Sequence, residues 1–226
     1  MKKPLSNINL KITRGVALVF VFLITSCSSI KLISSWKNPE FGLLFKPKKI
    51  LVVGVTPNYD ARSAFEFQLI NELNDRNITA LQSAVVFETS FQDSQQTEQE
   101  IELQVDKLLS KDYDTILVSM VKGVDDNESY GSDSSKTDYH LRRFIFYYLA
   151  YQDAYFNQDY YSRYKVFNIE TSVYNLKNET DKSLVWRGSF DLVDPNNNKK
   201  AIDLYVKKLI KTLEKEKIIP KKKWFR

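Results

Sequence analysis

The 226-residue sequence contains one cysteine, Cys27, and one histidine, His140. A single cysteine excludes an intramolecular disulfide framework and any metal site built from several thiolates. A nucleophilic triad would have to use His140 as its base, and this residue stands beside two arginines with no catalytic partner in the pattern. The sequence therefore predicts a structural or solvent-exposed histidine and no catalytic residues.

Glycine is also scarce, with six in the whole chain. A dinucleotide-binding loop needs several glycines so that the backbone can approach a pyrophosphate, but the segment 54–60 has only Gly54 and ends on the acid Asp60. No Walker lysine motif occurs, and the acidic residues between 125 and 133 fit no register of an EF-hand loop. We therefore expect neither a cofactor nor a metal.

The amino-terminal apolar run is too short to cross a membrane. It covers residues 15–24, whereas a spanning helix needs about 20 apolar residues. Residues 1–26 carry four bases and no acid, and the small residues Thr25 and Ser26 follow the run. A basic segment, a short apolar segment and small residues before a break are typical of a secretory signal. We predict that residues 1–26 are a signal peptide.

The residues Ile24-Thr25-Ser26-Cys27 resemble the lipobox of bacterial lipoproteins. The resemblance implies diacylation of Cys27 and cleavage that leaves it as the new amino terminus. Two or three acyl chains give stable anchoring, whereas one gives only marginal binding. Ser28 in place of aspartate resembles lipoproteins carried to the outer membrane, and the absence of an acidic cluster after Cys27, of the kind that resembles surface-export signals, favours its periplasmic face. The alternative is an ordinary buried thiol at Cys27 within a core segment.

The formal charge of +5 and the pI of about 9.0 would ordinarily favour nucleic acid or an anionic membrane as a partner. The charge is unevenly placed, however: residues 1–26 carry +4, residues 207–226 carry +7, and residues 27–206 carry −6. An exported, mildly acidic domain makes nucleic acid an implausible partner.

The basic tail over residues 220–226 is a candidate membrane contact. Lysines beside aromatic residues suit an anionic surface, at ~1 kcal/mol per cation. The alternative is a solvated helix face with a frayed end. The candidate residues are Lys221, Lys222, Lys223, Trp224, Phe225 and Arg226.

Hydrophobic patterning predicts one α/β domain over residues 46–219, after a lipidated tether and edge strand over 27–45. Continuous apolar runs are typical of strands buried on both faces. The segments between these runs have apolar residues at helical spacing and are expected to be helices. Asp60 is expected to cap the first helix, and Thr97 with Glu100 forms a capping box before the second. The inner strands are expected at 50–55, 78–87 and 114–121.

The second half of the domain predicts an antiparallel hairpin, from residues 164–174 and 183–193, and a final helix from about 198 to 217. Strands alternating with helices in the first half favour parallel pairing with right-handed crossovers. The expected fold is a single three-layer α/β domain. Its mixed sheet has a parallel first half and an antiparallel carboxyl-terminal hairpin, with helices on both faces.

Residues 122–163 predict a mobile insertion that is polar and rich in aromatic residues. The stretch 144–167 holds 11 of the chain's 30 Phe, Tyr and Trp residues. One interpretation is core, with Phe144, Phe146 and Tyr148 facing inward from a strand. The other is a surface for protein or glycan, because tyrosine suits interface anchors. The best contact candidates are Tyr155, Tyr160, Tyr161 and Tyr164.

Four stretches together resemble a group of uncharacterised bacterial lipoproteins with a Rossmann-like α/β domain. They begin at Ser35-Trp36, Lys49, Ile169-Glu170 and Leu184-Val185, and the likeness covers most of residues 34–219. The group is similar in layout to LpoB, CsgG and the amino-terminal domain of TolB. The resemblance implies a binding or envelope-assembly role and no catalytic residues.

The sequence thus predicts a lipid-anchored periplasmic lipoprotein that acts as a non-enzymatic binding module. Its expected partners are the membrane, through Cys27, and an envelope protein or peptidoglycan. One alternative is a structural lipoprotein whose basic tail contacts the membrane. Another is an enzyme acting on envelope material through Glu170 and Asp191 on the hairpin, which requires the two carboxylates to converge in a concave site.

Overall fold

The computed structural model describes residues 30–223 apart from 42–44, 57, 88–90, 92–93, 124–142, 153–165, 179–182 and 194–197. Several residues singled out in the sequence lie outside these ranges, and the predictions that concern them stay predictions. They are Cys27, His140, Tyr155, Tyr160, Tyr161, Tyr164, Trp224, Phe225 and Arg226.

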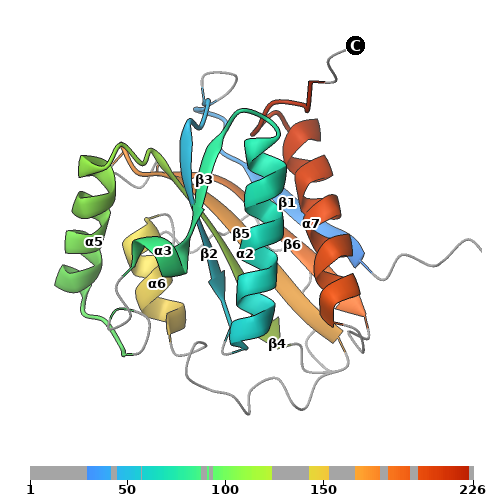
Figure 1. Ribbon diagram of the computed structural model, residues 1–226, viewed down its shortest axis with the longest axis horizontal. Helices are drawn as coiled ribbons and strands as arrows, with labels where there is room; N and C mark the ends of the chain where they lie inside the picture. Colours follow the sequence, from blue (N-terminus) through green and yellow to red (C-terminus); the bar gives the residue numbers. More distant parts are fainter. Residues whose placement is uncertain are drawn as a thin grey trace, which may run out of the picture.

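Six strands form one mixed sheet in the order β1-β6-β5-β4-β2-β3 (Figure 1). The strand β2 pairs in parallel with β3 and β4, and the pairs β4 with β5, β5 with β6, and β1 with β6 are antiparallel. The parallel first half, the antiparallel hairpin and the edge strand are therefore confirmed. The bounds are β1 (Ile30–Lys37), β2 (Lys49–Val55), β3 (Thr79–Gln82), β4 (Thr115–Gly123), β5 (Val166–Asn175) and β6 (Leu184–Val193).

Helices cover both faces of the sheet, as the patterning predicts (Figure 1). The helices α2 (Tyr59–Asn74) and α7 (Asn198–Lys215) lie together on one face. The other face carries α5 (Glu98–Ser110), α6 (Phe144–Tyr151) and the single-turn α3 (Ser83–Val86). Alternate residues of β2 enter the two cores, with Ile50 and Val52 toward α2 and α7, and Leu51 and Val53 toward α5 and α6. This explains why β2 is a continuous apolar run.

The predicted inner strand over residues 78–87 is wrong in length and position. Only Thr79–Gln82 is a strand, it lies at the edge of the sheet, and the chain then turns into α3. The reason is Ser83, whose backbone N–H and hydroxyl both donate to the Glu66 carboxylate of α2 and leave the strand ladder. Asp60 is not the cap of α2, because the side chain of Asn58 accepts from Ala61 N at 2.9 Å.

The start of the aromatic stretch is a helix, and the prediction of a strand there is wrong. Helical spacing buries Phe144, Tyr147 and Tyr148, whereas Phe146, expected to face inward, is only half-buried. The Tyr148 ring stacks on Phe91 at 5.4 Å between centroids. This part of the stretch therefore belongs to the core that α5 and α6 share.

The remaining elements follow the sequence closely. The Thr97–Glu100 capping box is present, and α7 buries Tyr205, Val206, Leu209 and Leu213. Within the described ranges, no helix combines the length and the apolar character that crossing a membrane demands.

Candidate functional site

A pocket of about 270 Å³ opens where β2 and β4 end, and we call it the β2–β4 pocket. Its walls come from the ends of these strands, from Ile169 of β5 and Leu192 of β6, and from the first turns of α2 and α7. Ligands of open α/β sheets bind at the carboxyl ends of parallel strands, where consecutive crossovers leave a crevice. The pocket occupies this position in the fold.

The turn from β2 into α2 brings the helix close to the strand. A Cβ placed on Gly54 would lie 3.2 Å from both Arg62 Cγ and Phe65 Cδ1, which is tighter than an ordinary contact. Asn58 then caps the helix, so that Ala61 and Arg62 of its first turn line the pocket. The glycine at position 54 therefore permits close packing of α2 against β2.

Two hydroxyl groups of the pocket's lining, those of Ser119 and Tyr205, belong to a buried cluster that also includes Thr171. The Ser119 hydroxyl lies 2.7 Å from Thr171 Oγ1 and 3.2 Å from the Tyr205 hydroxyl, and Thr171 and Tyr205 are hydrogen-bonded to each other. The Tyr205 ring is held by Phe65, stacked at 5.7 Å, and by the edge of Phe190 at 5.4 Å. Burial raises the pKa of Tyr205 to about 12, so the phenol stays protonated at neutral pH.

Most of the remaining lining is apolar, with Val55, Val121, Ile169, Leu192 and Ile202 among its members, and Thr56, Asn58 and Arg62 are its other polar residues. Arg62 is the charged side chain that the described lining contains, and its guanidinium lies over the Tyr59 ring at 5.3 Å. The described lining residues include no histidine, cysteine, aspartate, glutamate or lysine. Such a surface suits an apolar ligand oriented by a few hydroxyl groups.

Glu170 and Asp191 lie on the same face of the β5–β6 hairpin, but neither lines the β2–β4 pocket. Asn168 Nδ2 donates to Asp191 Oδ1 at 2.9 Å, and Arg187 Nε lies 3.9 Å from Glu170 Oε1. Glu170 and Tyr174 point to the same face of β5, because side chains alternate along a strand, and Tyr174 is buried in the core beneath α5 and α6. Glu170 and Asp191 therefore lie on the face of the sheet that carries α5 and α6. The two acids are therefore neighbours that other polar residues of the sheet engage.

Among the described residues, no group of three or more His, Cys, Asp and Glu side chains could hold a metal ion. The pocket itself was missed by sequence reasoning. The glycine-poor segment after β2 marks its position, but the sequence gives no signal that joins Ser119, Thr171 and Tyr205, which lie on three different elements.

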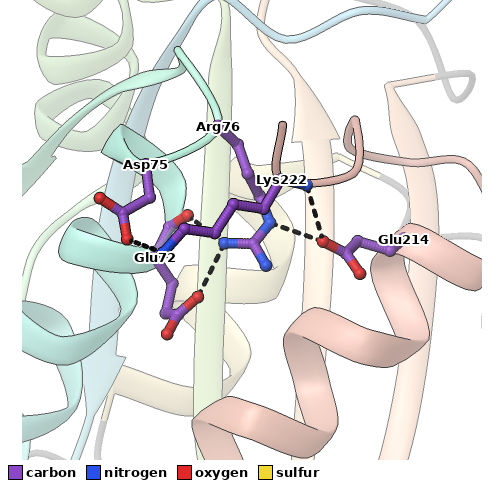
Figure 2. Close-up of polar contacts among 5 residues, drawn as sticks. All are labelled: Glu72, Asp75, Arg76, Glu214 and Lys222. Carbon is purple, nitrogen blue, oxygen red and sulfur yellow. Dashed lines mark hydrogen bonds and ion pairs between the residues drawn. The ribbon is translucent and has the colours of Figure 1, made fainter. Parts of the chain in front are cut away.

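The described part of the basic tail is folded against the body of the domain (Figure 2). Lys222 Nζ contacts Asp75 Oδ2 at 2.5 Å, and its backbone N–H donates to Glu214 Oε1 at 3.3 Å. The Lys222 ammonium holds the pKa of Asp75 below its usual range. Lys221 and Lys223 on either side are exposed. Lys222 is thus engaged within the protein, at the end of α2.

No protein-family model and no curated protein match the chain. Among solved structures it is similar to PelC from Paraburkholderia phytofirmans, a dodecamer, at 11% identity and a TM-score of 0.42, over 85% of this chain and 99% of that chain. It is also similar to the lipoprotein GNA1162 from Neisseria meningitidis, at 14% identity and a TM-score of 0.39, over 75% of this chain and 99% of that chain. Likenesses at this level carry no argument about function, and the resemblance to LpoB, CsgG and TolB stays a prediction.

Proposed function

We propose that the protein is a lipid-anchored bacterial envelope protein whose α/β domain binds a small, mainly apolar ligand in the β2–β4 pocket without reacting with it. The observation that carries the proposal is the pocket itself, which lies at the carboxyl ends of β2 and β4 and combines a mostly apolar lining with the buried hydroxyls of Ser119 and Tyr205. A general base, which a nucleophile such as the Ser119 hydroxyl would also need, requires a titratable group in the pocket, and the described lining offers none apart from Arg62 and the high-pKa phenol of Tyr205.

The anchor supports an envelope location. Cys27 ends a lipobox-like segment, Ser28 favours the outer membrane, and the absence of an acidic cluster after Cys27 favours its periplasmic face. Cys27→Ser should abolish labelling by a clickable fatty acid in growing cells. Labelling that persists in this variant would refute acylation at Cys27 and, with it, the anchored location.

Ligand binding is tested with a small apolar fluorophore on the non-acylated mature chain. We expect 1-aminoanthracene to gain fluorescence on binding, and Ala201→Phe to abolish the gain, because Ala201 lines the pocket and is buried. The control is Ala84→Phe, the same change on an exposed position of α3. Equal binding by both folded variants would show that the fluorophore binds elsewhere.

Contact with an envelope protein or peptidoglycan through Tyr155, Tyr160, Tyr161 and Tyr164 is a separate proposal, because these residues lie outside the described ranges. Photocrosslinking from Tyr160 or Tyr161 in living cells tests it. Recovery of neither protein nor glycan would count against such a surface.

A further inference from the structure

The lipid attachment site lies very close to the folded domain. Cys27 precedes Ile30, the first residue of β1, by three residues. An extended chain covers at most about 3.3–3.6 Å per residue, so this tether spans no more than about 10 Å. An acylated Cys27 therefore keeps the beginning of β1 next to the membrane surface.

The beginning of β1 and the β2–β4 pocket lie at the same end of the domain. Ile30 pairs with Leu192, which lines the pocket, and it is buried in the same core as Ala201 and Ile169. Figure 1 shows that β1 starts at the end of the sheet where β2 finishes and α7 begins. The anchor thus holds the pocket's end of the domain toward the bilayer.

The described lysines of the tail lie at the opposite end. Lys37, the last residue of β1, donates to the Glu216 carbonyl oxygen, just before the tail. In Figure 1 the segment after α7 lies at the end of the sheet opposite to the start of β1. The seven steps along β1 from Ile30 cover about 23 Å at ~3.3 Å each. Charges act over a screening length of only about 8 Å at physiological salt. In a domain whose β1 stands perpendicular to the membrane, with Ile30 nearest to the surface, Lys221–Lys223 therefore lie beyond the electrostatic reach of the membrane that carries its anchor.

Side chains at the anchored end suit a lipid headgroup region. Tyr59, at the start of α2, is 62% exposed and carries the Arg62 guanidinium over its ring. Lys199, in the first turn of α7, is also exposed. Tyrosine, arginine and lysine place their apolar parts against hydrocarbon while their polar ends stay in water.

We propose that this end of the domain faces the membrane and that the β2–β4 pocket takes one acyl chain of a membrane phospholipid. The inference rests on the proposed function, because it names the ligand class of the same pocket. Hydrocarbon is the apolar material nearest to a pocket held in this position. Ser119 and Tyr205 line the pocket and bond to each other and to Thr171 behind them, so a hydrocarbon chain can cover them without leaving their hydroxyls unpaired.

The orientation is tested with two matched variants of the acylated, full-length protein in phosphatidylethanolamine–phosphatidylglycerol vesicles. Lys199→Cys and Lys215→Cys place a thiol at exposed lysines near the two ends of α7, about 24 Å apart. Acylation consumes Cys27, the one natural cysteine, so the new thiol alone takes a nitrobenzoxadiazole label. We expect headgroup-spin-labelled lipid to quench the label at position 199 several-fold more strongly than at 215. Equal or reversed quenching would overturn the orientation.

The occupant is tested in the same vesicles with a phospholipid that carries a diazirine at the end of one acyl chain. We expect crosslinks on pocket-lining residues such as Ile169, Leu192 and Ile202. Ala201→Phe should lose these crosslinks several-fold, and the control Ala84→Phe should keep them at the level of the unmodified protein. Circular dichroism verifies that both variants are folded.

Three outcomes contradict the inference in different ways. Crosslinks confined to the exterior, or unchanged by Ala201→Phe, would overturn a phospholipid chain in the pocket. Crosslinks that form only when the diazirine is carried by the protein's own acyl chains would assign the pocket to the anchor instead. Retained 1-aminoanthracene binding without phospholipid crosslinks would overturn this inference but leave the proposed function standing, whereas loss of both would remove both.

Discussion

Glu66 is a buried carboxylate that joins α2 to β2 and to the start of α3. Its Oε1 accepts from Gly54 N at 2.8 Å and from the Ser83 hydroxyl at 2.6 Å, and its Oε2 accepts from Ser83 N at 3.1 Å. Burial raises the pKa of Glu66 above its ordinary value of 4.5, and the three donors only partly offset this effect. The residue ends β3 and positions the first turns of α2, and therefore one wall of the β2–β4 pocket.

Glu66→Gln should destabilise the protein more at pH 4.5 than at pH 7. The folded state holds the Glu66 proton more tightly than the unfolded state, so this group's contribution to stability falls as pH rises above 4.5. The variant lacks that titration. The NH2 group of the glutamine would also face one of the N–H or O–H groups that donate to Glu66, and two donors in contact cost about 1–3 kcal/mol. Urea denaturation of both proteins at the two pH values measures the difference, and an equal loss at both would contradict the raised pKa.

Gly188→Ala should lower the free energy of unfolding by about 1–3 kcal/mol, through overpacking against Trp186. A Cβ at position 188 would lie 2.3 Å from Trp186 Cη2 and 2.6 Å from Cζ2. The indole cannot move aside freely, because it is fully buried and its Nε1 donates to Glu216 Oε2 at 2.6 Å. Thermal unfolding and the near-ultraviolet circular dichroism of tryptophan report the effect. An unchanged free energy of unfolding would mean that the Trp186 ring adopts another buried position without cost.

At the scale of elements, the sequence predicts best what depends on neighbouring residues. The capping box at Thr97 is encoded within four positions, and the alternation of β5 and β6 within ten each. The end of β3 depends instead on Ser83 meeting Glu66, 17 positions earlier in the chain. A contact of this kind lies outside any local pattern, so the apolar run 78–87 reads as one strand.

The helix α6 shows a second limit. Its sequence FIFYYLAY is apolar on every side, with no polar face to distinguish a period of 3.6 from a period of 2. Tertiary packing decides the outcome, because Phe144, Tyr147 and Tyr148 contact Tyr174 or Phe91 of the core. The aromatic content predicts that this segment is buried, but it does not determine whether the segment is a helix or a strand.

Thr97→Ala should reduce stability by about 1 kcal/mol and fray the start of α5. The Thr97 hydroxyl accepts from Glu100 N at 3.3 Å, and the Glu100 carboxylate accepts from Thr97 N at 2.7 Å. The Thr97 N–H and, at 2.8 Å, the Thr97 hydroxyl both donate to the Glu100 carboxylate and hold its pKa below its usual range, so the box weakens when this acid is protonated. Thr97→Ser keeps the hydroxyl and is the matched control. Chemical denaturation compares the three proteins, and equal losses from alanine and serine would exclude a capping role.

At the scale of the whole molecule, the candidate site assembles from residues that are far apart in the sequence. Ser119, Thr171 and Tyr205 are separated by 52 and 34 positions, and β4, β5 and α7 bring them together. These residues come together because of the strand order, which follows from tertiary packing that no single segment encodes. The sequence predicts the sheet and both helix layers. The position of the pocket depends in addition on where each connecting helix crosses the sheet.

Arg76 joins the carboxyl-terminal ends of α2 and α7, and this link should be important for the stability of the whole domain. Its Nη1 contacts Glu72 Oε2 at 2.7 Å, and its Nε contacts Glu214 Oε1 at 2.7 Å (Figure 2). The Arg76 side chain is 6% exposed, so its loss leaves Glu214, 18% exposed, facing a poorly hydrated gap. A guanidinium serves two carboxylates in a fixed plane, a geometry that a lysine ammonium does not reproduce.

We expect Arg76→Met to lower the free energy of unfolding by about 2–3 kcal/mol, less than for a fully buried pair because both glutamates keep some access to water. Arg76→Lys should recover only a minor part of this loss. The control is Lys222→Met, which breaks the exposed contact with Asp75 and should change stability little. Urea denaturation of the three variants at low and high salt separates them. If Arg76→Met and Lys222→Met were equally mild, the two helices would be held together by their apolar faces alone.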